Sequence, residues 1–121
     1  MDFGVAKSAD DTASLTGSAA VGTIDYMAPE QIKDSTNVDH RADLYTLGVV
    51  VYELLSGKLP FEGNVAQVLF AHVNQPPPDV RKFNPNLSLE VAIALQRMLQ
   101  KDPNDRFQSA SEFIQALYLG L

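Results

Sequence analysis

The sequence predicts an all-α fold for this 121-residue chain. Three segments place apolar residues at positions i, i+3, i+4 and i+7, which brings them to one face of a helix. A fourth segment is apolar on nearly every face, and residues typical of helix ends flank these segments. We find no convincing strand pattern, no internal repeat and no domain linker.

Residues 1–22 are predicted to form a loop, because they are rich in Asp, Ser, Thr, Ala and Gly and show no sustained periodicity. A short helix is then expected to begin at Pro29, since proline suits the first helical position. Glu30, directly after it, complements the positive end of that helix.

The strongest predicted element is a helix over residues 39–56. Asp39 suits the N-cap and Asp43 lies near the first turn, whereas Gly57 suits the position after the last turn. The apolar residues leave almost no polar face, so this helix is expected to be buried on all sides. They are Leu44, Tyr45, Leu47, Val49, Val50, Val51, Tyr52, Leu54 and Leu55.

Three amphipathic helices are expected to follow. Their apolar sets are Val65, Val68, Leu69, His72 and Val73, then Val91, Ala94, Leu95, Met98 and Leu99, and finally Ala110, Phe113, Ile114 and Leu117. Ser88 is the expected cap of the second, and Ser109 with Glu112 forms a capping box for the third. A proline-rich connection joins the first two. His72, on an apolar face, is interpreted as a packed residue rather than a ligand.

Composition excludes several classes of function. The formal net charge of −6 disfavours binding to nucleic acid or to an anionic membrane, which needs a basic patch. The absence of cysteine excludes disulfides and thiolate metal sites, and two histidines are too few for a histidine cluster. The longest apolar stretch is far shorter than the roughly 20 residues of a membrane span, and no signal peptide is recognisable. A cytoplasmic protein is therefore expected.

Five short motifs occur in a fixed order along the chain. They are Asp-Phe-Gly at residues 2–4, Gly-Thr-Ile-Asp-Tyr-Met-Ala-Pro-Glu at 22–30, Asp-Leu-Tyr-Thr-Leu-Gly-Val at 43–49, Gly-Lys-Leu-Pro-Phe at 57–61 and Asp-Pro-Asn-Asp-Arg-Phe at 102–107. Together they closely resemble the C-terminal half of a protein kinase catalytic domain, over nearly the whole chain. The amino-acid sequence of residues 44–57 looks most like that of bacterial Ser/Thr kinases.

The resemblance implies a partial kinase domain over residues 1–121. Residues 1–30 would be the activation segment and residues 31–121 the helical C-terminal lobe, with no N-terminal lobe and no catalytic loop. Asp2 would hold Mg²⁺ against the phosphates of ATP, because a hard cation needs oxygen ligands. Phe3 would pack inward, and Gly4 permits backbone angles that a side chain would penalise.

Four residues of the activation segment match positions with roles in the family. Thr23 and Tyr26 match the segment that receives the substrate residue next to the phosphoacceptor, and Thr23 favours Ser/Thr substrates. Thr16 and Ser18 lie where related bacterial kinases carry activating phosphates. Such a phosphate adds nearly two negative charges and would pair with an arginine of the catalytic loop. An ordinary loop rich in Ser and Thr accounts for Thr16 and Ser18 equally well, without a role in phosphorylation.

The resemblance also implies a buried ion pair between Glu30 and Arg106, which would tie the activation segment to the last helices. Arginine suits this role because its planar fork meets a carboxylate with two hydrogen bonds. Asp43 would accept backbone hydrogen bonds from the catalytic loop.

Residues 40–43 superficially resemble the catalytic His-Arg-Asp triplet. The triplet needs Asp directly after Arg and Asn five residues later, whereas Ala42 intervenes here and Gly48 occupies the later position. A Gly-rich loop is also missing, and Lys7 follows the Asp-Phe-Gly motif, so it is not the strand lysine. The chain alone is therefore expected to be inactive and not to bind ATP and Mg²⁺ stably.

The favoured function is that of an intact parent that phosphorylates Ser or Thr in proteins with ATP and Mg²⁺. Met1 favours an internal methionine of a longer coding region over a dedicated short protein. The alternative is a non-catalytic module or decoy, which would dock protein substrates or other kinase chains through residues 64–73 and 88–101. A decayed gene without a function is the third possibility. Without the segments that cover its central helix, the chain is expected to expose apolar surface and to be sticky.

Overall fold

The computed structural model describes residues 24–33 and 35–121, which are helical apart from their connections. The α-helices are α3 (Pro29–Lys33), α4 (His40–Ser56), α5 (Val65–Asn74), α6 (Leu89–Met98) and α7 (Ala110–Leu119). Short 3-10 helices lie between them: η2 (Ser35–Asn37), η3 (Val80–Lys82) and η4 (Pro103–Asp105). No strand occurs in these two ranges, and the all-α prediction is confirmed.

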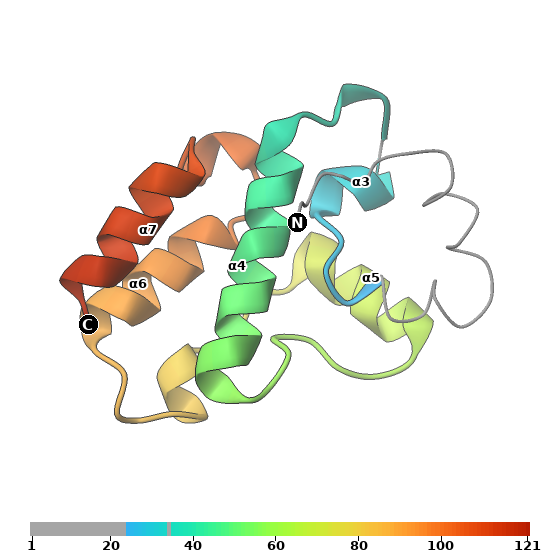
Figure 1. Cartoon of the computed structure of the whole chain (residues 1–121). Coiled ribbons are helices and arrows are strands. Elements are labelled where there is room, and N and C mark those ends of the chain that lie inside the picture. Colours follow the sequence, from blue (N-terminus) through green and yellow to red (C-terminus); the bar gives the residue numbers. More distant parts are fainter. Residues whose placement is uncertain (1–23, 34) are drawn as a thin grey trace.

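The long helix α4 lies at the centre of the molecule (Figure 1). Helices α6 and α7 pack together on one side of it, and α3 and α5 pack together on the other. Both ends of α4 form as the sequence predicts. The Asp39 side chain accepts a hydrogen bond from the Arg41 amide, and Gly57, with φ of 76°, donates its own amide to Glu53. A left-handed residue favours glycine, which explains why the helix ends there.

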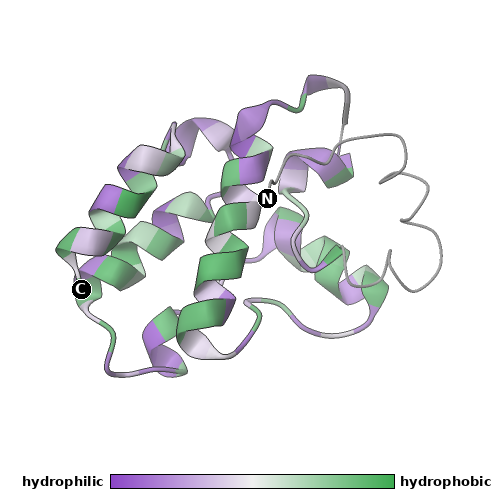
Figure 2. Ribbon diagram, in the orientation of Figure 1, coloured by the Kyte–Doolittle hydropathy of each residue, from purple (hydrophilic) through white to green (hydrophobic). Residues whose placement is uncertain are grey.

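Helix α4 is not buried on all sides in the described structure, and the expectation that it exposes apolar surface is confirmed. Figure 2 shows the helix coloured mainly as apolar, yet Leu54 is 77% exposed, and Leu47 and Val51 are only partly buried. In the described structure α4 packs against α3, α6 and η3, and these contacts do not cover its whole circumference. Apolar surface therefore stays open along the rest of it.

Close contact between α4 and α6 depends on Gly48. A Cβ atom at this position would lie 2.9 Å from Met98 Cγ and 3.0 Å from Leu99 Cδ2, too close for an ordinary contact. The absent side chain lets α6 press its apolar face against α4. All members of the apolar set predicted for α6 are buried in the core, namely Val91, Ala94, Leu95, Met98 and Leu99.

The apolar faces of α5 and α7 are narrower than predicted. On α7 Phe113 and Leu117 are buried, whereas Ile114 is 50% exposed, because α7 lies at the edge and packs mainly on α6. On α5 Val68 and His72 are buried, whereas Val65 faces solvent. None of the described helices combines the length and apolar composition that crossing a membrane requires.

The helix caps follow the predictions with one difference. Ser88 accepts from the Val91 amide, and Ser109 accepts from the Glu112 amide. The Glu112 carboxylate, however, accepts at 3.0 Å from the amide of Gln108, one residue before the cap, so the reciprocal bond of a capping box is displaced. A complete capping box occurs instead at α5, between Asn64 and Gln67, where the sequence analysis names none.

Candidate functional site

The candidate site is the segment of residues 24–30, which runs into the first turn of α3 and packs on α4 and α5. It contains Tyr26, one of the residues assigned to the substrate-receiving segment. The other assigned residues of the activation segment lie outside the described residues, and the structure says nothing of them. They are Asp2, Phe3, Gly4, Thr16, Ser18 and Thr23.

Helix α4 bonds Tyr26 at two places, the backbone carbonyl and the side-chain hydroxyl. The Thr46 hydroxyl donates to the Tyr26 carbonyl oxygen at 2.6 Å, and the Tyr26 hydroxyl donates to Glu53 Oε1 at 2.6 Å. Thr46 and Glu53 stand two helical turns apart, so they lie on one face of α4. The bond to the Glu53 carboxylate, with burial, raises the pKa of Tyr26 to about 12. The tyrosine therefore stays neutral and keeps its donor at neutral pH.

Asp25, directly before Tyr26, is contacted from α5. Its carbonyl oxygen lies 3.1 Å from Nε2 of His72, and Nδ1 of the same ring lies 2.7 Å from the Tyr45 hydroxyl. His72 is completely buried, so its interpretation as a packed residue is confirmed. Burial, together with the carboxylates of Glu53 and Glu62, raises the pKa of the Asp25 side chain. The segment thus lies between two helices, with a bond to each.

The structure brings Glu30 and Arg106 together across 76 positions of sequence. Arg106 Nη1 lies 2.7 Å from Glu30 Oε2 and Nη2 lies 2.7 Å from Oε1, so the pair is bidentate. The remaining N–H groups donate to the backbone carbonyls of Arg41, Gln100 and Lys101. All five donors of the guanidinium are therefore used, which a fully buried cation requires.

Asp43 is exposed in the first turn of α4. It lies at the edge of a cavity of about 460 Å³ that is also lined by His40, Leu44, Leu47, Gln108, Ser109 and Ala110. The neighbouring residues of the triplet-like sequence have structural contacts. His40 Nε2 lies 3.0 Å from the Gln108 carbonyl oxygen, and Arg41 bonds Asp39 and Asn104. Nothing in this geometry resembles a catalytic base beside a substrate site.

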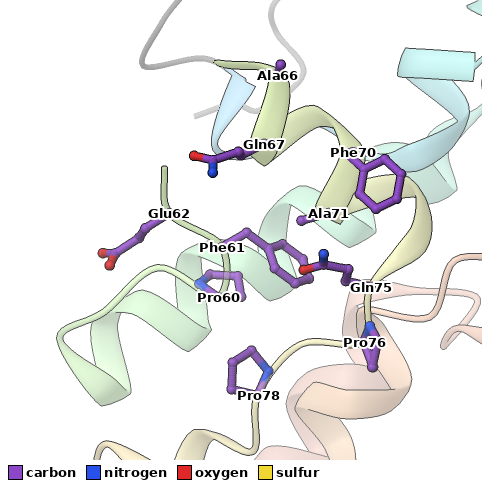
Figure 3. Close-up of a pocket in the computed structure, with 10 residues that line it drawn as sticks. All are labelled: Pro60, Phe61, Glu62, Ala66, Gln67, Phe70, Ala71, Gln75, Pro76 and Pro78. Atoms are coloured by element: carbon purple, nitrogen blue, oxygen red, sulfur yellow. The ribbon is translucent and has the colours of Figure 1, made fainter. Parts of the chain in front are cut away.

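A groove of about 510 Å³ opens beside α5. Figure 3 shows Phe61 at its centre, with residues of α5 on one side and prolines of the following connection on the other. The lining residues are Pro60, Phe61, Glu62, Ala66, Gln67, Phe70, Ala71, Gln75, Pro76 and Pro78. The Tyr52 hydroxyl donates to the Pro78 carbonyl at 2.7 Å and anchors the proline wall to α4. The sequence analysis missed this groove, although the Gly-Lys-Leu-Pro-Phe motif and the proline run both form part of it.

Lys101 contacts two of the residues that line the groove, Ala71 and Phe61. Its Nζ donates to the Ala71 carbonyl at 3.1 Å and lies 4.7 Å from the centroid of the Phe61 ring. Burial and the charge of Arg106 lower the pKa of Lys101 to about 8. The ammonium thus stabilises the end of α5, since cations are favourable near helix C-termini.

Comparison with known proteins decides the family. The sequence model of the protein kinase domain matches residues 1–119. The chain belongs to the protein kinase family. A curated relative, Serine/threonine-protein kinase Pkn1 of Myxococcus xanthus, is 46% identical over 124 residues, which cover all of this chain and 18% of the relative. The kinase PknB of Mycobacterium leprae is 39% identical over 114 residues, with 93% of this chain and 18% of the relative covered.

Solved kinase structures share the fold. The kinase domain of Mycobacterium tuberculosis PknI superposes with a TM-score of 0.63 at 31% identity, over 79% of this chain and 34% of that one. The autoinhibited serine kinase domain of the giant muscle protein titin superposes with a TM-score of 0.70 at 30% identity, over 79% of this chain and 30% of that one. The kinase chain thus spans about a fifth of the length of the curated relatives and about a third of the solved domains.

The kinase family implies ATP and Mg²⁺ for its intact members. In the described part of this kinase chain, no three His, Asp or Glu side chains come together in a way that could hold a metal ion. Asp2, the residue assigned to Mg²⁺, lies outside the described residues, so this finding does not concern it.

Proposed function

We propose that the complete protein to which this chain belongs is a Ser/Thr protein kinase, in which residues 24–30 hold the substrate. The observation that carries the proposal is the fixation of this segment. Thr46 and Glu53 hold Tyr26, and Arg106 holds Glu30 with two hydrogen bonds. Phosphoryl transfer depends mostly on positioning, so a segment that receives a protein substrate must itself be rigid.

The remaining assignments belong to the same proposal. Residues 1–30 would act as the activation segment and residues 31–121 as the helical lobe. Asp2 would bind Mg²⁺, Thr16 and Ser18 would accept activating phosphates, and Asp43 would hold a catalytic loop. ATP, bound with Mg²⁺, would supply the phosphoryl group. Proteins are the expected partners, and a cytoplasmic location follows from the need for ATP.

The 121-residue chain by itself is proposed not to transfer phosphate. Its sequence contains neither a Gly-rich loop nor a His-Arg-Asp loop, and these parts hold the nucleotide and the catalytic base in the family. The contribution of this chain is to receive and orient the protein substrate.

The test uses the protein made from the longest reading frame that contains residues 1–121. Incubated with labelled ATP, Mg²⁺ and a Ser/Thr protein substrate, it should incorporate label on Ser or Thr, and Asp2→Ala should abolish incorporation. The exposed Arg81→Ala serves as the matched control and should leave the rate unchanged. Absence of any transfer by the unmodified protein, under conditions where a relative is active, would contradict the proposal.

A second candidate function, a non-catalytic docking module or decoy, is favoured by the groove beside α5. Phe70 on its rim is 57% exposed, and a large exposed apolar residue next to a groove is typical of an interface. Purified chain should then bind a full-length relative such as Pkn1 with a measurable Kd, and Phe70→Ser should weaken binding whereas Tyr118→Ser, exposed on α7, should not. Equal binding by both variants would exclude the groove as the contact.

A further inference from the structure

His72 connects two helices to the proposed substrate segment. It belongs to α5, yet its ring nitrogens bond the Tyr45 hydroxyl of α4 and the Asp25 carbonyl of the segment. The side chain has no exposed surface, and its ring packs edge-on against Tyr45 and Phe61 at centroid distances of 5.6 and 5.2 Å. Such a ring has only one orientation that keeps both bonds.

The chemistry of the partners fixes which nitrogen carries the proton. A backbone carbonyl only accepts hydrogen bonds, so Nε2 must be the N–H that donates to Asp25. In a neutral imidazole Nδ1 then accepts, and the Tyr45 hydroxyl donates to it. The three residues form a directed chain of donors, from Tyr45 through His72 to the segment.

We propose that His72 is a positioning residue for the substrate, which sets the place of the Asp25–Tyr26 peptide by holding the Asp25 carbonyl. The inference rests on the proposed function, because it assumes that this segment receives the phosphorylated protein. Thr46 and Glu53 hold Tyr26 from α4, and His72 holds the preceding residue from α5. Two adjacent residues are thus fixed from two sides.

The same ring also links the segment to the groove. Phe61 lies at the centre of the groove and contacts the His72 ring, and Ala71, next to His72, lines the groove wall. Helix α5 therefore has the groove on one side and the substrate segment on the other. A displacement of α5 moves His72, and with it the Asp25 carbonyl.

A positioning role and a merely structural role predict different kinetics. If His72 only fills the core, its replacement lowers the fraction of folded enzyme and leaves the KM of the protein substrate unchanged. If it positions the segment, the KM of the protein substrate rises while the KM of ATP stays the same, because the proposed role of the segment concerns the protein substrate alone.

The experiment measures both KM values in the complete kinase. His72→Phe removes both ring hydrogen bonds, and loss of the one to the Asp25 carbonyl should raise the KM of a Ser/Thr peptide roughly tenfold, with the KM of ATP within about twofold. His72→Gln, whose amide can donate to the carbonyl, should restore most of the loss.

A tyrosine pair provides the matched control and covers the case in which His72→Phe fails to fold. Tyr45→Phe removes the hydroxyl that donates to Nδ1 of His72, whereas Tyr52→Phe removes a tyrosine hydroxyl of the same helix that bonds Pro78 instead. Only the first should raise the peptide KM. Unchanged peptide KM in His72→Gln, His72→Phe and Tyr45→Phe in an active kinase would overturn this inference alone. Complete inactivity of the unmodified kinase would overturn the proposed function and this inference with it.

Discussion

At the scale of single residues, buried polar groups decide what the site can do. Arg106, His72 and Tyr45 lie without exposed surface, and each makes hydrogen bonds to a partner far away in sequence. Burying such groups is unfavourable unless every donor finds an acceptor. They therefore fix the relative positions of the helices and of the segment beside them.

Glu30→Ala should destabilise the chain strongly, because it leaves the Arg106 cation buried without its counter-charge. Removing one partner of a buried ion pair costs roughly 3–5 kcal/mol. The free energy of unfolding in urea measures the loss. Arg81→Ala removes the exposed pair with Asp79 and should cost far less, because solvent screens exposed ion pairs. A similar loss in both variants would contradict the importance of burial.

His72 should make the chain less stable as the pH falls. Burial and the Lys101 charge lower the pKa of His72 to about 4, from a usual value near 6.5. Between these values the unfolded chain binds a proton that the folded chain excludes, so the stabilisation is complete above pH 6.5 and is lost down to pH 4. Relative to His72→Gln, the free energy of unfolding should drop by roughly 3 kcal/mol from pH 7 to pH 4.

The comparison with His72→Gln isolates this effect. Asp25, whose pKa is raised by burial, acts in the opposite direction, because the folded chain takes up its proton first as the pH falls. Asp25 is present in both proteins, and its contribution cancels in the difference. Parallel stability curves for the two proteins would show that His72 is not excluded from protonation in the fold.

At the scale of elements, the ends of the helices and their buried faces could be predicted from the sequence. Asp39, Ser88 and Gly57 act where their residue types predict, because caps depend on local chemistry alone. The sequence indicated that the central helix would expose apolar surface, but not that Leu54 and Ile114 would be the exposed residues, because this depends on which neighbours cover each helix. The same holds for the displaced partner of Glu112, which depends on the path of the chain before α7.

Gly48→Ala should weaken the packing of α4 on α6. The added methyl group would meet Met98 and Leu99 at 3.0 Å or less, and overpacking of this kind costs roughly 1–3 kcal/mol. Gly57→Asn is the comparison, since asparagine tolerates the left-handed conformation and nothing lies near its Cβ position. Thermal unfolding should show the larger loss for Gly48→Ala, and the reverse order would contradict the close contact of the two helices.

At the scale of the whole molecule, the site could be predicted only in part. The resemblance placed Tyr26, Glu30 and Arg106 in functional positions, because the motifs carry their residue types at fixed spacing. The bonds of His72 and the groove around Phe61 were not predicted, since they join parts of the chain that only folding brings together. The helical periodicity places His72 on a buried face, but it does not show which groups bond its ring nitrogens.

Exposed apolar surface should make the isolated chain associate with itself. Leu54 on α4 is 77% exposed beside partly buried neighbours, and a patch of this kind promotes aggregation. Leu54→Lys should therefore shift the chain toward monomer in size-exclusion chromatography over a concentration series, with helix content unchanged. A wild-type chain that is already monomeric at high concentration, with a sharp cooperative melt, would contradict this expectation.

The central claim is that this chain orients a protein substrate and lacks the parts that transfer phosphate. The most direct test incubates the purified 121-residue chain alone with labelled ATP, Mg²⁺ and a Ser/Thr protein substrate. No incorporation above that of a heat-denatured sample is predicted. Incorporation that Asp2→Ala abolishes would show that the chain catalyses transfer by itself, and the claim would be wrong.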